Sequence, residues 1–367
     1  QCPTRHRLIK TMDCQSALNF DRHCQTNANR SAQPRNRKNR RKQIMAFKTL
    51  ILAGAILAAS LSTTFAGTLE DVKSRGILNC GASEGVPGFS NPDANGNWAG
   101  LDSDICRAIA AAIFNDPTKV NFVPLASKQK ILAVVTGQVD LTSRTTTWTM
   151  KRDTKEGVDF TTIVFYDGQG FMVRKDLGVT DARQLKGASV CVTTGTTTEL
   201  NLADFALANN IKMEAVVFEG KKEAVNAYKS GRCDAFTTDS SQLAAFRTTF
   251  KNPGDHLILK ELISKEPLSP LVRHGDNKWK DLVTWVINGL ITAEELGVTS
   301  KNATDMAANT KNPTIKRLLG TSGEYGVYIG LEKDWMLRAI TKVGNYGEIF
   351  ERNLGQGTPL KLKRGVN

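Results

Sequence analysis

The sequence DLTSRTTTWTMKR spans Asp140 to Arg152, and the apolar run KILAVVTGQV leads directly into it. A helical apolar run, a glycine and a short strand that opens into a polar loop are typical of a strand end in an α/β sheet. The guanidinium group of Arg152, one helical turn further on, could bind both oxygens of a carboxylate, while neighbouring hydroxyls fill the remaining lone pairs. The hydroxyls around Arg144 belong to Thr142, Ser143, Thr145, Thr146 and Thr147. The stretch therefore predicts a carboxylate site, and the alternative is a threonine-rich surface turn with solvated arginines.

The first 66 residues differ in composition from the rest. Met45 begins a short basic segment, followed by an apolar run from Leu50 to about Leu61 and small residues that end at Ala66. This pattern predicts a secretory signal peptide over 45–66, cleaved after Ala66 and too short for a comfortable transmembrane helix. Because a signal peptide starts a chain, we expect residues 1–44 to be upstream sequence or a wrong start, with no part in the fold.

The strong positive charge lies mostly in this leader. Residues 1–66 hold 12 of the 49 Lys and Arg residues and 2 of the 36 Asp and Glu residues, so residues 67–367 contribute only +3 of the net charge of +13. A nearly neutral remainder gives no electrostatic reason to expect nucleic acid as a partner. Its length is enough for two hydrophobic cores of ordinary size.

Four cysteines follow the leader, and export would make disulfides plausible. Of the three connectivities, we expect Cys80–Cys106, between a strand and the next long helix, and Cys191–Cys233, between two strands. The alternative is four buried free thiols. With no CxxC and only two histidines after the leader, we expect neither a metal site nor a cofactor.

Two α/β patterns follow each other along the chain. The first predicts a helix over 68–75, strands over 77–81, 120–125 and 138–141, and helices over 101–114 and 128–136, with Asp102 capping the longer helix. The second predicts strands over 189–193, 215–218 and 233–237, and helices over 199–209, 222–230 and 241–250. This order indicates parallel sheets with right-handed crossovers. From Lys278 the chain is mainly helical, and we expect these helices to pack on the first lobe.

Polar residues follow strands in both patterns, where open α/β sheets bind ligands. Thr145, Thr147 and Arg152 do so in the first pattern. In the second, Thr196 and Thr197 open a helix whose amino terminus favours an anion, and Asp239 could accept an ammonium. Together they predict a zwitterion site shared by two lobes, although Thr197 and Asp239 could each be helix caps instead.

Six segments resemble the periplasmic amino-acid-binding proteins of bacterial ABC transporters, solute-binding family 3, and most closely the general L-amino-acid-binding subgroup. The segments are GLDSDICRAIAAAIF (100–114), DLTSRTTTWTMKRD (140–153), FYDGQGFMV (165–173), GTTTELNLADF (195–205), GRCDAFTTD (231–239) and ISKEPLSPLVRHGD (263–276). The resemblance implies the two-lobed type II periplasmic-binding-protein fold with a helical C-terminal extension. It assigns 68–166 and 268–367 to the first lobe and 167–267 to the second, with hinges near 166–170 and 263–267.

The resemblance also implies roles for single residues. Arg152 would hold the α-carboxylate of the ligand with help from Thr145, Thr147 and Thr197, and Asp239 would hold the α-ammonium. Many relatives carry an aromatic residue in the first loop, where this chain has Val86, Pro87, Gly88 and Phe89. This difference suits a broad pocket that includes Ser83, Glu84, Phe89 and Trp148.

The function implied is binding of L-amino acids, polar or acidic ones such as glutamate, glutamine and aspartate, by a monomer in the periplasm that delivers them to a membrane permease. A second hypothesis is a dehydratase on the same scaffold with Glu84 as acid or base. A third is the sensor domain of a receptor, which the lack of a later apolar span disfavours. Gly81 to Gly85 matches G-x-S-x-G, but Pro87 and Gly88 follow in place of a helix, so a serine hydrolase is not expected.

Overall fold

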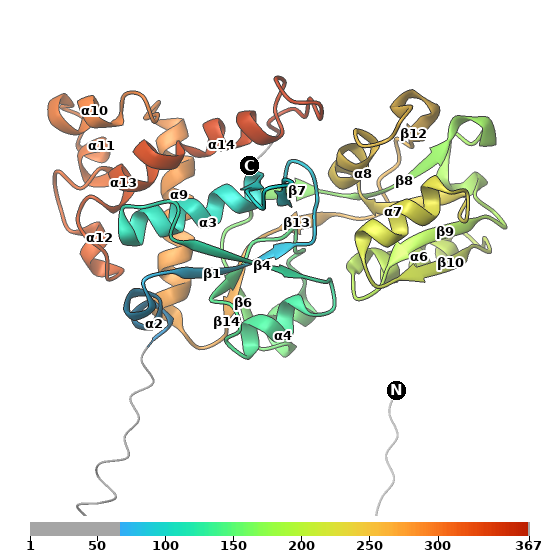
Figure 1. Ribbon diagram of the computed structural model, residues 1–367, viewed down its shortest axis with the longest axis horizontal. Helices are drawn as coiled ribbons and strands as arrows, with labels where there is room; N and C mark the ends of the chain where they lie inside the picture. The colour runs from blue at the N-terminus through green and yellow to red at the C-terminus, as the bar shows by residue number, and fades with distance from the viewer. Residues whose placement is uncertain (1–66, 366–367) are drawn as a thin grey trace, which may run out of the picture. The chain divides into compact units, whose positions relative to one another are not determined.

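The computed structural model describes residues 67–365. The predicted leader, 1–44 and 45–66, lies outside the described residues. The described chain forms two five-stranded α/β sheets and a group of C-terminal helices (Figure 1). We call each sheet with its covering helices a lobe.

The first sheet has the strand order β4-β1-β5-β14-β6. Its strands are β1 (Leu78–Ser83), β4 (Val120–Leu125), β5 (Leu141–Thr142), β6 (Val158–Phe160) and β14 (Leu271–Arg273). The strands β4, β1 and β5 are parallel, as expected, and β14 returns antiparallel to both β5 and β6. The last strand therefore comes from a distant part of the chain and completes the first lobe.

The first lobe also contains four helices and a short strand pair. The helices are α2 (Thr68–Arg75), α3 (Leu101–Phe114), α4 (Lys130–Val135) and α5 (Met150–Lys155), and the strands are β2 (Asn91–Pro92) and β3 (Trp98–Ala99). The helix α3 has the predicted bounds, but the expected Asp102 cap is wrong. Gly100 precedes the helix, and the buried Asp102 carboxylate instead accepts hydrogen bonds from Ser143 Oγ (2.9 Å) and Thr145 N (3.1 Å). As the second helical residue, Asp102 faces the loop after β5 and holds it in place.

The second sheet has the order β10-β9-β11-β8-β12. Its strands are β8 (Gln169–Arg174), β9 (Ser189–Thr193), β10 (Glu214–Phe218), β11 (Ala235–Asp239) and β12 (His256–Ile258). The helices of this lobe are α6 (Thr197–Ala208), α7 (Lys221–Lys229) and α8 (Ser240–Arg247), with single 3-10 turns at Lys175–Leu177, Ala182–Gln184 and Pro253–Asp255. Parallel strands β10, β9 and β11 place their carboxyl ends at one edge of the sheet.

Two antiparallel strands connect the lobes. In β7 (Phe165–Asp167) and β13 (Glu266–Leu268), Asp167 pairs with Glu266 and Phe165 with Leu268. The loop after β5 adds to this ribbon, because Trp148 N donates to Pro267 O at 2.8 Å and Ser269 N donates to Thr146 O at 3.0 Å. The polar loop of the first lobe is thus fixed to the chain crossing.

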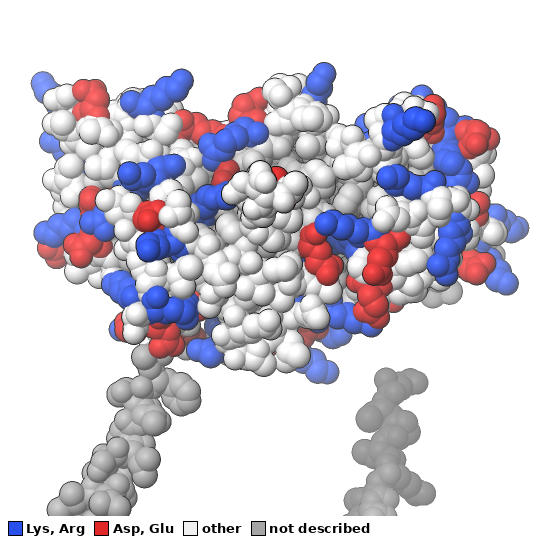
Figure 2. All heavy atoms as spheres, in the orientation of Figure 1, with Lys and Arg blue, Asp and Glu red and all other residues white. Residues whose placement is uncertain are grey.

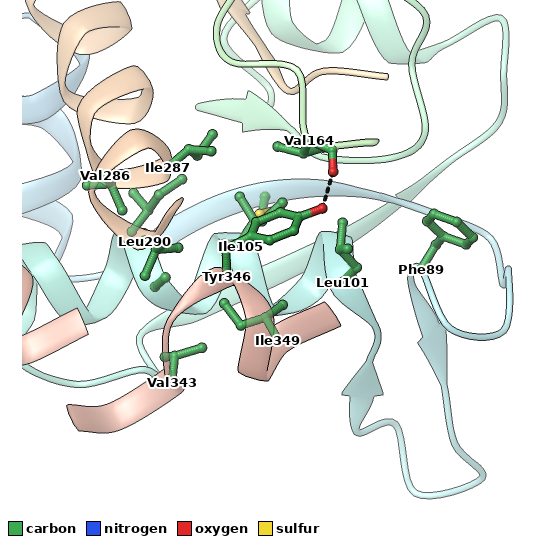
Figure 3. Close-up of a cluster of buried hydrophobic side chains, with 14 of the residues drawn as sticks. Phe89, Leu101, Ile105, Val164, Val286, Ile287, Leu290, Val343, Tyr346 and Ile349 are labelled. Atoms are coloured by element: carbon green, nitrogen blue, oxygen red, sulfur yellow. Dashed lines mark hydrogen bonds between the residues drawn. A yellow bond between two sulfur atoms is a disulfide. The ribbon is translucent and has the colours of Figure 1, made fainter. Parts of the chain in front are cut away.

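The C-terminal helices pack on the first lobe, as expected, with α9, α13 and α14 against α3 (Figure 1). They are α9 (Asn277–Glu295), α10 (Ala303–Asn309), α11 (Pro313–Leu318), α12 (Tyr325–Tyr328), α13 (Trp335–Val343) and α14 (Tyr346–Asn353). Tyr346 lies among Leu101, Ile105 and Leu290, and its hydroxyl donates to Val164 O (Figure 3). A buried hydroxyl with a partner lets this large side chain fill the core without an unpaired polar group.

Both expected disulfides are present. Cys80 in β1 is bonded to Cys106 in α3, and Cys191 in β9 to Cys233 just before β11. Each disulfide ties the central region of one lobe to a neighbouring element. On the face in view, basic and acidic side chains are interspersed rather than gathered by sign (Figure 2).

Candidate functional site

Two adjoining cavities lie where the strand ends of the lobes face each other. The outer one has a volume of about 550 Å³ and the inner one about 20 Å³, roughly the space of one water molecule. Both are lined by Ser127, Lys130, Arg152, Thr196 and Thr197. Residues of both lobes therefore enclose a single site, and the lobes are in contact around it.

Arg152 projects from α5 into both cavities. The short helix α5 is capped by Thr149, whose hydroxyl accepts from Arg152 N at 3.3 Å, and the Arg152 side chain donates through Nη1 to Thr147 O at 2.9 Å. Burial lowers the pKa of Arg152, while Glu156, Glu266 and Asp239 act in the opposite direction. The guanidinium stays charged and presents further donors to the cavities, as an anion site requires.

Asp239 ends β11 on the opposite side of the inner cavity. It precedes α8, but its side chain does not cap that helix. Its carboxylate accepts from Gln242 Nε2, and the oxygen of the same amide accepts from Lys221 Nζ. Burial, with the nearby carboxylate of Asp167, raises the pKa of Asp239 to about 8. A buried carboxylate in this state would gain from a cationic partner.

The loop after β5 is held in an unusual conformation at Thr145. Its φ of 50° lies in the left-handed region, which is uncommon for residues other than glycine. Thr145 N donates to Asp102, and Thr145 Oγ1 accepts from Lys221 Nζ of the second lobe at 3.4 Å. The conformation is thus fixed by polar contacts on both sides of the loop.

Thr147 and Thr197 meet across the cavity, and their hydroxyl oxygens are 3.4 Å apart. Both hydroxyls donate to Oε2 of Glu266, at 2.8 Å from Thr197, and Asn201 Nδ2 donates to Oε1 at 2.9 Å. The proton of each hydroxyl is therefore directed to Glu266, whose carboxylate holds the two threonines together across the cavity. Glu266 was missed by the sequence reasoning, although it lies in the quoted segment 263–276.

Thr196 lines the cavities and also caps the helix α6. Its hydroxyl accepts from Glu199 N at 3.2 Å and donates to Thr193 O at 2.6 Å, so it caps α6. Thr196, and not Thr197, is therefore the N-cap of α6. The Thr197 side chain is left to line the cleft.

Three further cations line the inner cavity, and sequence reasoning did not assign them to it. They are Lys130, Arg144 and Lys221. Burial lowers the pKa of Lys221 to about 8 and that of Arg144 to about 10. Arg144 was visible in the opening stretch, but Lys130 and Lys221 begin helices and carry no sequence signal that would distinguish them from surface lysines.

Four expected pocket residues do not line either cavity. Ser83 is buried and bonds to Ser90, with their hydroxyl oxygens 2.7 Å apart. Phe89 packs in the core with its ring edge against Phe165, and Trp148 stacks on Phe160. Glu84 is exposed. The structure does not bring these side chains to the cluster around Arg152.

Neither a metal centre nor a membrane span is found between residues 67 and 365. No group of three or more His, Cys, Asp or Glu side chains there could hold a metal ion. None of the helices in this range combines the length and apolar character needed to cross a bilayer.

Comparison with known proteins extends over most of the chain. It is 52% identical over 318 residues to the general L-amino acid-binding periplasmic protein AapJ of Rhizobium johnstonii, covering 86% of this chain and 93% of that protein. It is 49% identical to the glutamate/glutamine/aspartate/asparagine-binding protein BztA of Rhodobacter capsulatus, covering 88% of this chain and 94% of that protein. Both relatives are described as binding proteins.

Solved structures agree with the fold. An ABC transporter periplasmic binding protein from Brucella ovis with glutathione bound is 53% identical, with a TM-score of 0.80, and covers 82% of this chain and 94% of that chain. An ancestral amino acid-binding protein described as a precursor of cyclohexadienyl dehydratase is 28% identical, with a TM-score of 0.54, and covers 63% of this chain and 95% of that chain.

The family model for the bacterial extracellular solute-binding proteins, family 3, matches residues 78–302. This range includes every strand of both sheets, both disulfides and all residues of the two cavities. The chain belongs to family 3 of the bacterial extracellular solute-binding proteins.

Proposed function

We propose that this protein binds L-amino acids between its lobes as the solute-binding component of an ABC transporter. The observation that carries the proposal is the pair Arg152 and Asp239, a buried guanidinium and a buried carboxyl group that come from different lobes and line one cavity. A guanidinium suits an α-carboxylate, and a desolvated carboxylate suits an α-ammonium. Polar or acidic amino acids, including glutamate, glutamine and aspartate, are the proposed ligands.

Ligand entry requires motion between the lobes. The inner cavity of about 20 Å³ is too small for an amino acid, and contacts such as Lys221 Nζ to Thr145 Oγ1 cross it. The proposed division assigns 68–166 and 268–367 to the first lobe and 167–267 to the second. Bending at the ribbon β7–β13 would open the site, as in hinge closure around a ligand.

The proposed setting follows from the names of the relatives. AapJ is described as periplasmic, and the related protein YhdW of Escherichia coli, 46% identical, as a putative amino-acid ABC transporter-binding protein. We accordingly propose that this chain acts in the periplasm as a monomer, after removal of 1–66, and delivers its ligand to a membrane permease. Neither a cofactor nor nucleic acid is part of the proposal.

The test is calorimetric titration of residues 67–367, refolded to remove copurified ligand, with a panel of L-amino acids. Arg152→Ala should weaken binding of every ligand by about 10- to 100-fold, because each carries the α-carboxylate and the lost hydrogen bonds are charge-assisted. Arg183→Ala is the control, since Arg183 is exposed and pairs with Asp181. Undiminished binding by Arg152→Ala would show that the carboxylate lies elsewhere, and no binding by the parent protein would refute the proposed function.

The dehydratase hypothesis is not favoured. Its suspected acid or base, Glu84, is exposed and lines neither cavity. The relatives reported above are described as binding proteins, and the structural relative connected with a dehydratase is itself described as amino acid-binding.

A further inference from the structure

The inner cavity has more positive charges than an α-amino acid backbone can use. Lys130, Arg144, Arg152 and Lys221 line it, against the single carboxylate of Asp239. All five side chains are buried or nearly so. If Arg152 binds an α-carboxylate and Asp239 an α-ammonium, the remaining cations outnumber the anions in the cavity wall. Desolvated charges of one sign are costly unless a counterion accompanies them.

Arg144 is a buried cation with an unpaired donor group. It is 2% exposed, and its Nε has no hydrogen-bond partner among the described residues. Asp102 and Glu84 both supply opposite charge to Arg144, and the Asp102 oxygens accept from Ser143 Oγ and Thr145 N. A buried guanidinium with an unsatisfied donor is rare in proteins, because the lost hydration is not replaced.

The other cations in the cavity wall differ from Arg144 either in having hydrogen-bond partners or in lining both cavities. Lys221 Nζ donates to Gln242 Oε1 and Thr145 Oγ1. Arg152 donates to Thr147 O, and Lys130 lines the outer as well as the inner cavity. Arg144 lines the inner cavity but not the outer one, and it lies in the same loop as Thr145 and Thr147. Its planar donor set suits a second carboxylate better than a neutral amide, which would add no negative charge to that of Asp102 and Glu84.

We propose that Arg144 is a specificity-determining residue that binds a carboxylate in the ligand side chain. The preferred ligands are then L-amino acids with an acidic side chain, and their uncharged amides bind through the α-amino and α-carboxylate groups alone. This inference rests on the proposed function and adds to it the group that distinguishes acidic from neutral ligands.

The experiment compares L-glutamate with L-glutamine, which have nearly the same size and differ in side-chain charge. Wild-type residues 67–367 should bind glutamate about 10- to 100-fold more tightly, as expected for a charge-assisted interaction. In Arg144→Gln this preference should fall to within about threefold, chiefly through weaker glutamate binding. Arg152→Gln should weaken both ligands by the same factor, and Arg183→Gln should change neither.

The outcomes separate the two proposals. Equal weakening of glutamate and glutamine by Arg144→Gln would overturn the inference while leaving the proposed function intact. Wild-type protein that binds glutamine as tightly as glutamate would also overturn it, and this measurement does not depend on the variant folding. If the wild-type protein binds no amino acid, the proposed function fails and this inference fails with it.

Discussion

Asp239 shows how a buried site residue connects ligand binding to stability. Its pKa is raised to about 8, first by burial and then by the charges of Asp167 and Glu266. The positive charges of Lys221 and Lys130 act in the opposite direction. An unfolded aspartate titrates near 3.8. Because the folded pKa is the higher one, the stability that Asp239 contributes is fully present below pH 3.8 and is lost as the pH rises through about 8.

Asp239→Asn should therefore stabilise the ligand-free protein in a pH-dependent manner. We expect its free energy of unfolding to exceed that of the wild type by roughly 2 to 5 kcal/mol at pH 8, and the difference to shrink towards pH 4. Urea denaturation at several pH values measures both. A constant difference across this range would contradict the assignment of a raised pKa.

Asp234 provides a control with the opposite sign. Its carboxylate accepts from Ser189 N (2.8 Å) and Ser189 Oγ (2.7 Å), which lower its pKa. Its contribution to stability is present above pH 3.8 and is lost as the pH falls through the lowered value. Asp234→Asn should therefore be less stable than the wild type at neutral pH, with a smaller deficit in acid.

At the scale of elements, the disulfides add the clearest stabilisation. Cys191 and Cys233 are separated by 42 residues. Closing a loop of this length in the unfolded chain corresponds to roughly 4 kcal/mol. Replacing both residues by alanine should lower the free energy of unfolding by about this amount, measured by urea denaturation. Reductant should destabilise the wild type more than the variant, and an equal effect on both would contradict a role for this disulfide.

The elements that could be predicted from sequence are those defined by local patterns. The helix Leu101–Phe114 and the strand Ser189–Thr193 have the predicted bounds, because apolar periodicity and neighbouring turn residues suffice to define them. By contrast, β5 is only two residues long, Leu141–Thr142, and is specified by pairing with Gly81 and Leu271. Such pairing depends on residues far away in the chain and has no local signal.

The same distinction applies to the site. Arg152, Thr147 and Asp239 were expected near the ends of predicted strands, and the structure brings all three to one cavity. Phe89 was expected in the pocket but packs against Phe165, a contact that only the folded chain reveals. Glu266 is separated from Thr147 by 119 residues, and nothing in the sequence connects the two. Sequence patterns thus identify strand ends, whereas the side chains that fill the space between lobes depend on tertiary packing.

For the whole molecule, Glu266 links the lobes within the strand pair that connects them. It belongs to β13, and its carboxylate accepts from Thr147 of the first lobe and from Thr197 and Asn201 of the second. Glu266 is 1% exposed, so these bonds form away from water, where charge-assisted hydrogen bonds are strongest. The contact therefore favours the arrangement in which the lobes touch.

Glu266→Ala should shift the ligand-free protein towards an open form, visible as a larger radius of gyration in small-angle X-ray scattering. Because a ligand bound by both lobes needs the closed form, affinity for every ligand should fall by a common factor of about 10. Glu219→Ala is the matched control, since Glu219 also bridges the lobes through Lys128 at 2.8 Å but is exposed, where an ion pair contributes little. If the two variants behave alike, closure does not depend on Glu266. If affinity falls for glutamate and not for glutamine, Glu266 acts on the ligand side chain and not on the hinge.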